Sequence, residues 1–160
     1  MGKIVVGISD MQISNKPDDI LITYSLGSCI GLVIWDPAVK AGGLLHYMLP
    51  DSKLDPKKAE EKPFMFADKG IPRLFKELYT LGASKSNMVV KVFGGGQIMD
   101  SDGIFNIGKR NYMILRQMFL KNKVMINKED IGGTVNRTVS LEIGTGVTRV
   151  KISGKGEFEI

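Results

Sequence analysis

The chain has 160 residues, of which 43% are hydrophobic and 24% are charged, and its formal net charge is +5 at pH 7. This length favours one domain with a sizeable core, and the composition is typical of a soluble globular protein. No apolar run approaches the roughly 20 residues that span a bilayer, and the first residues lack the apolar stretch of a signal peptide. We therefore expect a single domain over residues 1–160, cytoplasmic and without membrane insertion.

The positive charge is spread along the chain, and the Lys and Arg residues are not interleaved with aromatic residues. Surfaces that bind single-stranded nucleic acid combine basic and aromatic side chains, and other nucleic-acid interfaces cluster their basic residues. The sequence therefore argues against nucleic acid as a partner. Docking to an acidic protein partner stays open.

Two short strands are predicted first, at Lys3–Ile8 and Ile20–Thr23, where β-branched residues are frequent. The segment Ser25-Leu26-Gly27-Ser28 follows the second strand. Its small residues allow a sharp bend and leave backbone N–H groups free to point at a ligand.

A strand, turn and strand are predicted next, from the apolar run Cys29–Trp35 to the run that ends at His46. With the tight turn at Asp36–Val39, the register places Cys29 directly opposite His46. Directly opposed residues share a sheet face, with Cβ atoms roughly 4.5 to 5.5 Å apart, so the thiol would reach the imidazole. The proline in this turn disfavours a tight hairpin, so a longer loop stays open, and a one-residue slip would separate the two side chains.

Cys29 and His46 are the only cysteine and the only histidine of the chain. A single cysteine forms no internal disulfide, which agrees with a reducing compartment. A thiolate is a nucleophile, and imidazole is well suited to remove the thiol proton near neutral pH, so the pair is sufficient for covalent catalysis on an acyl carbon. One Cys and one His fall short of the usual ligand set of a zinc site, and we expect no metal and no cofactor. The alternative that both are core residues stays open.

The middle of the chain is predicted to hold a solvated loop and a helix. The loop, Asp51–Pro63, carries eight charges and leaves directly from the strand of His46, so it is placed to shape or cover the site. The helix, Phe64–Leu81, has apolar residues at helical spacing and ends at a glycine. Pro72 indicates that its regular part begins near that residue, or that an earlier turn is kinked.

The second half is predicted to alternate between strands and one more helix. A strand at Met88–Phe93 ends in three glycines, which lack the spacing of a phosphate-binding loop and instead predict close backbone packing beside the site. Asn106 is a candidate N-cap for a helix that runs to about Asn122. A short strand at Val124–Ile126 and an alternating hairpin over Val139–Ile152 complete the chain. The class is α+β, with helices packed against a largely antiparallel sheet.

Five motifs lie in order between about Lys3 and about Ile152. They are Thr23-x-x-Leu26-Gly27-Ser28-Cys29, Gly43-x-x-His46-x-Met48-Leu49-Pro50, Phe93-Gly94-Gly95, Asn106-Ile107-Gly108-x-Arg110-Asn111, and Asp130-x-Gly132-Gly133 followed by Arg137. Together they resemble the chemoreceptor glutamine deamidase family, CheD. The resemblance implies a three-layer α/β/β sandwich, similar to the cytotoxic necrotizing factor-type cysteine deamidases. Thr134 and Asn136 depart from the family's pattern.

By this resemblance, Cys29 is the nucleophile, His46 is the base and then the acid, and Thr23 orients the imidazole. The implied reaction converts glutamine side chains of methyl-accepting chemotaxis receptors to glutamate, releasing ammonia, through a Cys29 thioester. Backbone N–H groups around Gly27 and Ser28 are candidates for holding the oxyanion. The implied partners are the receptors and a CheC-type phosphatase.

Three other activities stay open. The chain is also compatible with a non-catalytic chemotaxis adaptor that binds receptors or a CheC-type phosphatase while Cys29 is idle. A thiol peptidase or amidase acting on another substrate would use the same residues. The same residues would also hydrolyse a glutamyl methyl ester.

Overall fold

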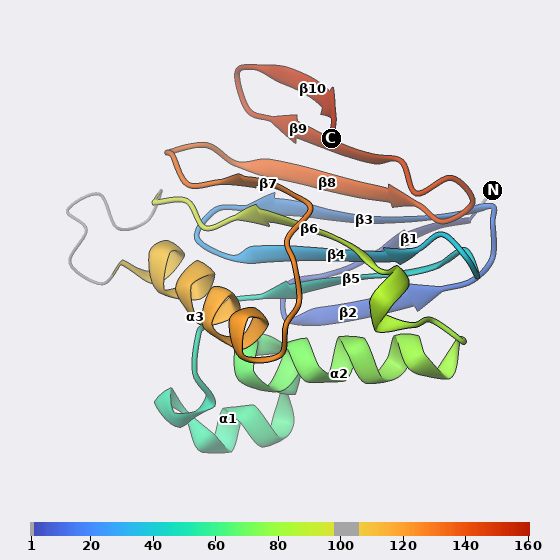
Figure 1. Cartoon of the computed structure of the whole chain (residues 1–160). Helices are drawn as coiled ribbons and strands as arrows, with labels where there is room; N and C mark the ends of the chain where they lie inside the picture. Colours follow the sequence, from blue (N-terminus) through green and yellow to red (C-terminus); the bar gives the residue numbers. More distant parts are fainter. Residues whose placement is uncertain (1, 98–105) are drawn as a thin grey trace.

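The computed structural model describes residues 2–97 and 106–160, which form ten strands and three α-helices (Figure 1). The strands are β1 (Gly2–Val5), β2 (Asp10–Ser14), β3 (Asp19–Leu26), β4 (Ile30–Asp36), β5 (Ala41–Tyr47), β6 (Val89–Gly94), β7 (Lys128–Ile131), β8 (Arg137–Glu142), β9 (Thr148–Ile152) and β10 (Gly156–Glu159). The helices are α1 (Pro56–Glu61), α2 (Ala67–Thr80) and α3 (Ile107–Lys121).

The strands form two sheets of five strands each. The first has the order β1-β3-β8-β9-β10, and the second has the order β2-β5-β4-β6-β7. Neighbouring strands are antiparallel, except that β1 is parallel to β3 and β6 is parallel to β7. The predicted α+β class is confirmed. The strand pattern predicted one largely antiparallel sheet, whereas the chain forms two.

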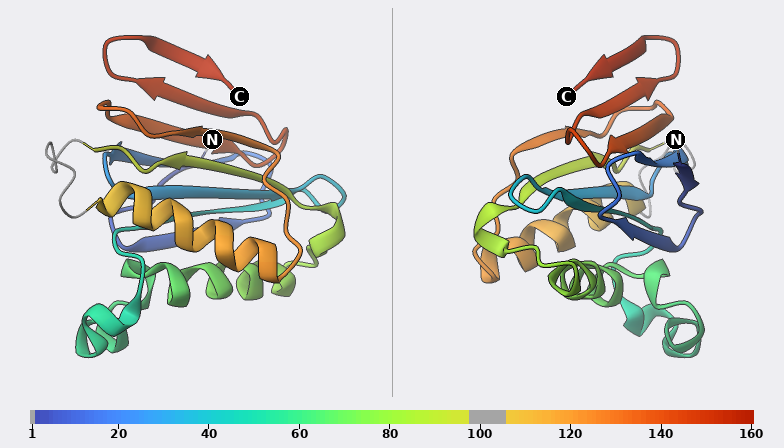
Figure 2. Two further views of the ribbon diagram at one scale, coloured as in Figure 1. Left: turned by 60° about the vertical axis from the view of Figure 1, so that its left-hand side comes forward. Right: turned by 90° about the vertical axis from the view of Figure 1, so that its right-hand side faces the viewer.

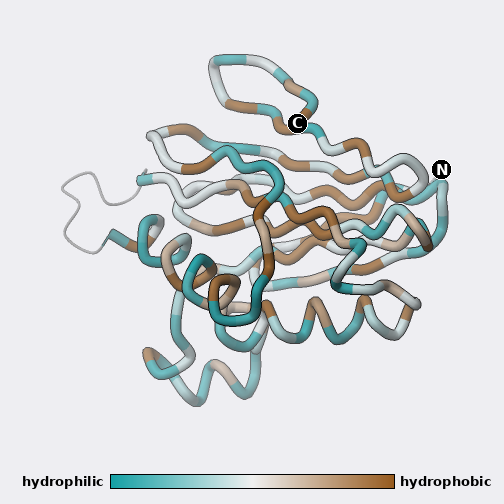
Figure 3. The backbone as a smooth tube through the Cα atoms, viewed as in Figure 1, coloured by the Kyte–Doolittle hydropathy of each residue, from teal (hydrophilic) through white to brown (hydrophobic). Residues whose placement is uncertain are grey.

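The two faces of the second sheet are covered by different layers (Figure 2). Helices α2 and α3 pack on one face, where side chains such as Leu45 and Tyr47 meet Leu74 and Leu115 in one cluster. The first sheet covers the other face, where Leu44 belongs to a second cluster. Because β5 is covered on both faces, all seven of its residues are buried. The most hydrophobic segments accordingly gather in the central strands (Figure 3).

The hairpin of β4 and β5 has a longer turn than predicted. Asp36 pairs with Ala41, so the connecting loop is Pro37–Lys40, and Gly31 rather than Cys29 pairs with His46. The predicted direct opposition of Cys29 and His46 is therefore wrong by two residues. Because side chains alternate between faces with a period of two, this shift keeps both residues on the same face. They become diagonal neighbours instead of directly opposed ones.

The segment Asp51–Pro63 was predicted to be a loop, and this prediction is wrong. It contains a short 3-10 helix, Ser52–Leu54, followed by α1. The side chain of Asp55 accepts a hydrogen bond from the backbone N–H of Lys58, and proline occupies the first turn of α1. An Asp followed by Pro is a favourable helix start, and the density of charges obscured this signal in the sequence.

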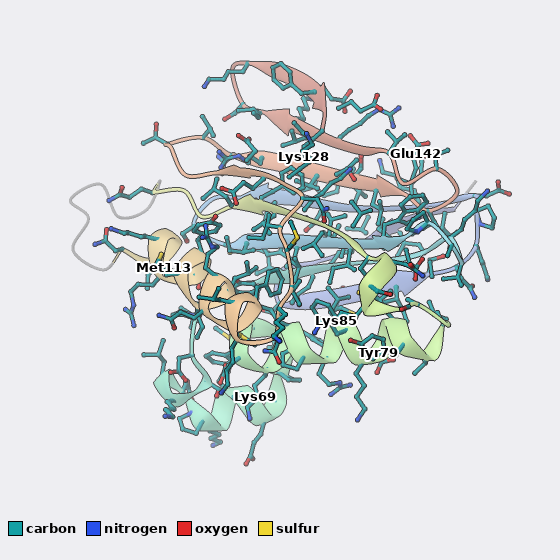
Figure 4. All side chains as sticks on the ribbon, viewed as in Figure 1. Lys69, Tyr79, Lys85, Met113, Lys128 and Glu142 are labelled. Atoms are coloured by element: carbon teal, nitrogen blue, oxygen red, sulfur yellow. The ribbon has the colours of Figure 1, made fainter. Side chains whose placement is uncertain are left out.

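The two longer helices agree with their predicted positions. Helix α2 contains Pro72 in its interior, so this proline neither begins nor ends it. Helix α3 starts after Asn106 as expected, although the side chain of Asn106 makes no capping hydrogen bond. Exposed side chains such as Tyr79 on α2 and Met113 on α3 project away from the sheets (Figure 4). No helix of the described segments is long and apolar enough to cross a lipid bilayer.

The strand predictions differ from the structure mainly at the edges of the sheets. The hairpin of β8 and β9 is confirmed, and its buried and half-buried residues alternate along β8. The strand predicted at Val124–Ile126 is wrong, because that segment is irregular and β7 follows it. Strands β2 and β10 were not predicted. Both are short edge strands. β10 has a single apolar residue, whereas Met11 and Ile13 of β2 do alternate with polar residues, a signal that the sequence analysis missed.

Candidate active site

A histidine and a threonine from opposite sheets meet between them. His46 lies on β5 in the second sheet, and Thr23 lies on β3 in the first; both are fully buried. Nδ1 of His46 is 2.7 Å from Oγ1 of Thr23. The structure thus brings together two of the three residues that the sequence placed in the catalytic set.

The hydrogen bonds of Thr23 determine which nitrogen of His46 carries the proton. Oγ1 of Thr23 donates to the carbonyl oxygen of Val6 at 2.7 Å. A hydroxyl has a single proton, so this oxygen accepts the second hydrogen bond, and Nδ1–H of His46 donates it. The lone pair of the imidazole is then on Nε2. Nε2 is buried and has no hydrogen-bond partner within residues 2–97 and 106–160, so it is free to act as a base.

Cys29 lies just before the first residue of β4 and is half-buried at the edge of the layer between the sheets. It packs against the cluster between the two sheets, the side of the second sheet on which His46 meets Thr23. Its backbone is held by a glycine turn at the end of β6: the N–H of Gly95 donates to the carbonyl of Cys29 at 2.9 Å, and the N–H of Gly96 donates to that of Gly27 at 2.8 Å. The close backbone packing predicted for these glycines is confirmed.

Glycine is required at the point where this turn contacts the cysteine. Gly94 has a φ of +107°, and a Cβ added to it would lie 2.2 Å from the carbonyl oxygen of Cys29. The first feature is a backbone conformation that L-residues rarely adopt, and the second is a steric clash with backbone atoms. A side chain at this position would therefore displace the backbone of Cys29.

The bend before Cys29 orients two peptide groups. The carbonyl of Gly27 accepts from Gly96, and the carbonyl of Ser28 accepts from Nδ2 of Asn111 at 2.9 Å. In a planar trans peptide the N–H points opposite to the C=O. The N–H groups of Ser28 and Cys29 therefore point away from these two partners.

Two buried polar residues near the site received no individual role from the sequence. Asn111 occupies a buried position of α3 and donates to the carbonyls of Ser28 and Met48, at 2.9 and 2.8 Å. Arg137 is only 4% exposed and shares the buried phase of β8 with Val139. A polar residue at an apolar phase of a helix or strand is the signal that points to both.

Arg137 connects the first sheet to the glycine turn. Its Nε donates to Oδ2 of Asp130 at 2.8 Å, and its two terminal nitrogens donate to the carbonyls of Gly132 at 2.9 Å and Gly94 at 3.3 Å. The guanidinium is buried, and these three acceptors satisfy its nitrogens. The Asp130 carboxylate, which balances its charge, is partly exposed. Arg137 thereby supports the turn that holds Cys29.

The site is neutral at pH 7. Burial raises the pKa of the Cys29 thiol to about 11, an increase that its own backbone N–H partly opposes. Burial also lowers the pKa of His46 to about 4. The resting pair is therefore a thiol and a neutral imidazole, and a nucleophilic attack by Cys29 requires transfer of its proton to Nε2. Within the described residues, no group of three His, Cys, Asp or Glu side chains is arranged to hold a metal ion.

The fold and the site define an α+β protein in which a thiol and an imidazole occupy one face of a sheet, an arrangement suited to covalent acyl chemistry. A family model described as CheD chemotactic sensory transduction matches residues 48–152. The chain belongs to the CheD family.

Relatives match almost the whole chain. A probable chemoreceptor glutamine deamidase CheD 1 from Syntrophus aciditrophicus is 59% identical over 154 residues, which cover 96% of each chain. A probable chemoreceptor glutamine deamidase CheD from Solibacter usitatus is 46% identical and covers 97% of this chain and 92% of its own. A third, CheD 2 from Anaeromyxobacter dehalogenans, is 42% identical and covers 94% of this chain and 95% of its own.

Proposed function

We propose that this protein is a deamidase that converts specific glutamine side chains of methyl-accepting chemotaxis receptors to glutamate. The hydrogen bond between Thr23 and His46 is the observation that carries the proposal, because it leaves Nε2 unprotonated and free on the sheet face that Cys29 shares. The relatives named as probable chemoreceptor glutamine deamidases supply the substrate class.

The first half of the reaction forms a thioester. Nε2 of His46 accepts the thiol proton while Sγ of Cys29 attacks the carboxamide carbon of the glutamine. The N–H groups of the Gly27-Ser28-Cys29 segment donate to the oxyanion that develops on the carboxamide oxygen. Protonated His46 then gives its proton to the leaving nitrogen, and ammonia departs as the C–N bond breaks.

The second half hydrolyses the thioester. Nε2 of His46 removes a proton from a water molecule as the water oxygen attacks the thioester carbon. The C–S bond breaks, the sulfur of Cys29 recovers the proton from His46, and the glutamine has become glutamate. Thr23 keeps the imidazole oriented and in its Nδ1–H tautomer through both halves. Its hydroxyl stabilises the imidazolium less than a carboxylate would.

The wider setting follows from the same proposal. Residues 1–160 act as one deamidase domain in the cytoplasm, where a reducing environment keeps the Cys29 thiol free. The layers of helices, sheet and sheet are compatible with a likeness to the cytotoxic necrotizing factor-type deamidases. A CheC-type phosphatase is a second partner, on the resemblance of the sequence motifs.

The proposal is tested by incubating the protein with the cytoplasmic fragment of a cognate chemoreceptor. Peptide mass spectrometry identifies each glutamine that becomes glutamate, and an ammonia assay measures the rate. We expect conversion by the wild-type protein, and the Cys29→Ala variant should lose it while keeping its fold and its binding to partners.

Each alternative has its own outcome in this experiment. Receptor binding without any Cys29-dependent conversion would refute the deamidase and support an adaptor. Cleavage of the receptor backbone would support a peptidase, and loss of glutamyl methyl esters would add an esterase activity. Conversion that continues in Cys29→Ala would overturn the assignment of the nucleophile.

A further inference from the structure

We propose that Asn111 is a positioning residue of this reaction: its side-chain amide holds the Ser28–Cys29 peptide so that the Cys29 N–H faces the developing oxyanion. The inference rests on the proposed thiol chemistry and adds a residue of α3 to it. It is carried by two hydrogen bonds of one buried amide group and by the place where the β4–β5 ladder ends.

The amide of Asn111 is oriented by two carbonyl groups. Nδ2 has two N–H groups, one for the carbonyl of Ser28 at 2.9 Å and one for the carbonyl of Met48 at 2.8 Å. A flipped amide would present oxygen to both carbonyls, so only one orientation is compatible with these contacts. The Asn111 side chain is fully buried, and both of its donors are used.

The first hydrogen bond determines where the Cys29 N–H points. The Ser28 carbonyl and the Cys29 N–H belong to the same planar peptide and point in opposite directions. With the carbonyl held on the side of α3, the N–H is directed away from the helix. The same N–H partly opposes the rise in the pKa of the Cys29 thiol. An oxyanion donor of acyl-transfer enzymes occupies this kind of position.

The second hydrogen bond ties the cysteine segment to the histidine strand. The last ladder pair of β4 and β5 is Ile30 with Tyr47, so Cys29 and Met48 lie just beyond it. By donating to the carbonyls of Ser28 and Met48, Asn111 connects the two chain segments past the end of the ladder. The phenolic O–H of Tyr47 donates to the Asn111 carbonyl at 2.6 Å, which attaches the same strand to α3 a second time.

Packing alone does not account for an asparagine here. Oδ1 of Asn111 is buried and makes no hydrogen bond with the described part of the chain. A buried acceptor without a partner is destabilising, and an apolar residue at this phase of α3 would avoid that penalty. Leu115 and Phe119 occupy the same buried side of the helix. The two N–H donors of Asn111 are what an apolar residue would lack.

Two reactions of Cys29 that need no receptor test this role. Acylation by p-nitrophenyl acetate develops an oxyanion and depends on the Cys29 N–H, whereas alkylation by iodoacetamide develops none. We expect Asn111→Leu, which removes both donors without changing charge, to slow acylation by about ten- to a hundredfold, the range expected for a small misplacement of a reacting group. Alkylation should change by less than about threefold, because Thr23 and His46 are unaffected.

Asn122→Leu is the matched control. Asn122 lies at the other end of α3, where it is exposed and its Nδ2 donates to a single helix carbonyl, that of Met118 at 2.8 Å. Both reactions should keep wild-type rates in this variant. If Asn111→Leu fails to fold by circular dichroism, Asn111→Ser, which keeps a polar side chain but lacks the two N–H donors, replaces it with the same expectations.

The outcomes separate a positioning role from a structural one. A loss of acylation with alkylation retained supports the proposal, and kcat for receptor deamidation should then fall while KM stays within about twofold. Unchanged acylation, or acylation and alkylation altered by the same factor, would overturn it. If the wild-type protein converts no receptor glutamine, the proposed function fails, and the ratio of the two small-molecule reactions still decides the role of Asn111.

Discussion

The proposed nucleophile and the proposed base are held in different ways. His46 lies within β5, paired with Asp10 of β2 on one side and Gly31 of β4 on the other, and it is fully buried. Cys29 lies outside the ladder, is half-buried, and depends on hydrogen bonds from Gly95 and its neighbours. The base is therefore part of the core. The nucleophile lies at a junction, the bend Gly27–Cys29 that joins β3 to β4. Substitutions around the base should lower stability and activity together, and the nucleophile itself should be replaceable without loss of the fold.

The largest effect is expected from removing the base. His46→Gln keeps a buried polar side chain of similar size that cannot accept a proton from the thiol. We expect deamidation to fall by about 10²- to 10⁴-fold, the usual contribution of a general base. The rate of ammonia release measures the loss, and thermal unfolding controls for folding. A rate near that of the wild type would show that another group removes the proton.

The junction that carries Cys29 should be sensitive to the glycine turn. In Gly94→Ala the added Cβ meets the carbonyl oxygen of Cys29, so we expect a loss of roughly 3–5 kcal/mol in the free energy of unfolding and a loss of activity in the folded fraction. Gly154→Ala is the control, because Gly154 also has a positive φ, +77°, with no atom within 4 Å of an added Cβ. It should lose about 1–2 kcal/mol and keep full activity. If the two variants lose equal stability and activity, the contact between residue 94 and Cys29 has no effect of its own.

A smaller effect is expected at Thr23, which links the base to the other sheet. Thr23→Val keeps the shape of the side chain but removes the hydroxyl. Nδ1–H of His46 then loses the acceptor that fixes its tautomer, and the Val6 carbonyl loses a donor. We expect about 1–3 kcal/mol of lost stability and a deamidation rate lowered by roughly tenfold.

Thr148→Val provides the comparison for this variant. Thr148 is also fully buried in the first sheet, and its hydroxyl donates to the Gly146 carbonyl at 3.3 Å. Denaturant unfolding and deamidation assays should show that this variant loses stability alone. If both variants lose activity to the same degree, Thr23 has no role beyond the fold.

The pH dependence of the free energy of unfolding should report His46 and Cys29 separately, because His46 titrates on the acid side and Cys29 on the alkaline side. The pKa of His46 in the folded state, about 4, lies below its ordinary value of 6.5, so the unfolded chain binds more protons and stability falls as pH falls from 6.5 to 4. The full effect is at most about 3 kcal/mol. The pKa of Cys29 is raised from 9.0 to about 11, so stability falls as pH rises through that interval.

Urea unfolding across this pH range measures both slopes. The acid slope should be weaker in His46→Gln, and the alkaline slope should be weaker in Cys29→Ala. A wild-type slope retained in either variant would assign the titration to another group.

The sequence predicted most of the elements that its local patterns describe. The apolar phase of α3 and the alternation of β8 gave both elements close to their true bounds, because burial of one face imposes a period on the sequence. Cys29 and His46 were predicted as a catalytic pair from their chemistry, their spacing and the family resemblance, and their roles stay predictions. In the charge-rich segments α1 and β7 the sequence pattern did not predict the element. Helix α1 is stabilised by the cap at Asp55, and β7 is stabilised by pairing with β6.

Only the tertiary structure decided how these pieces meet. The loop Pro37–Lys40 shifted the register of Cys29 and His46 by two residues, and the separation into two sheets brought Thr23 to the imidazole. Contacts between sheets join residues distant in sequence, so no periodicity reports them. The same holds for Asn111, whose sequence position shows a polar residue on an apolar helix face but not the two carbonyls that it holds. The residue types proposed to do the chemistry are visible in the sequence, whereas their geometry depends on non-local packing.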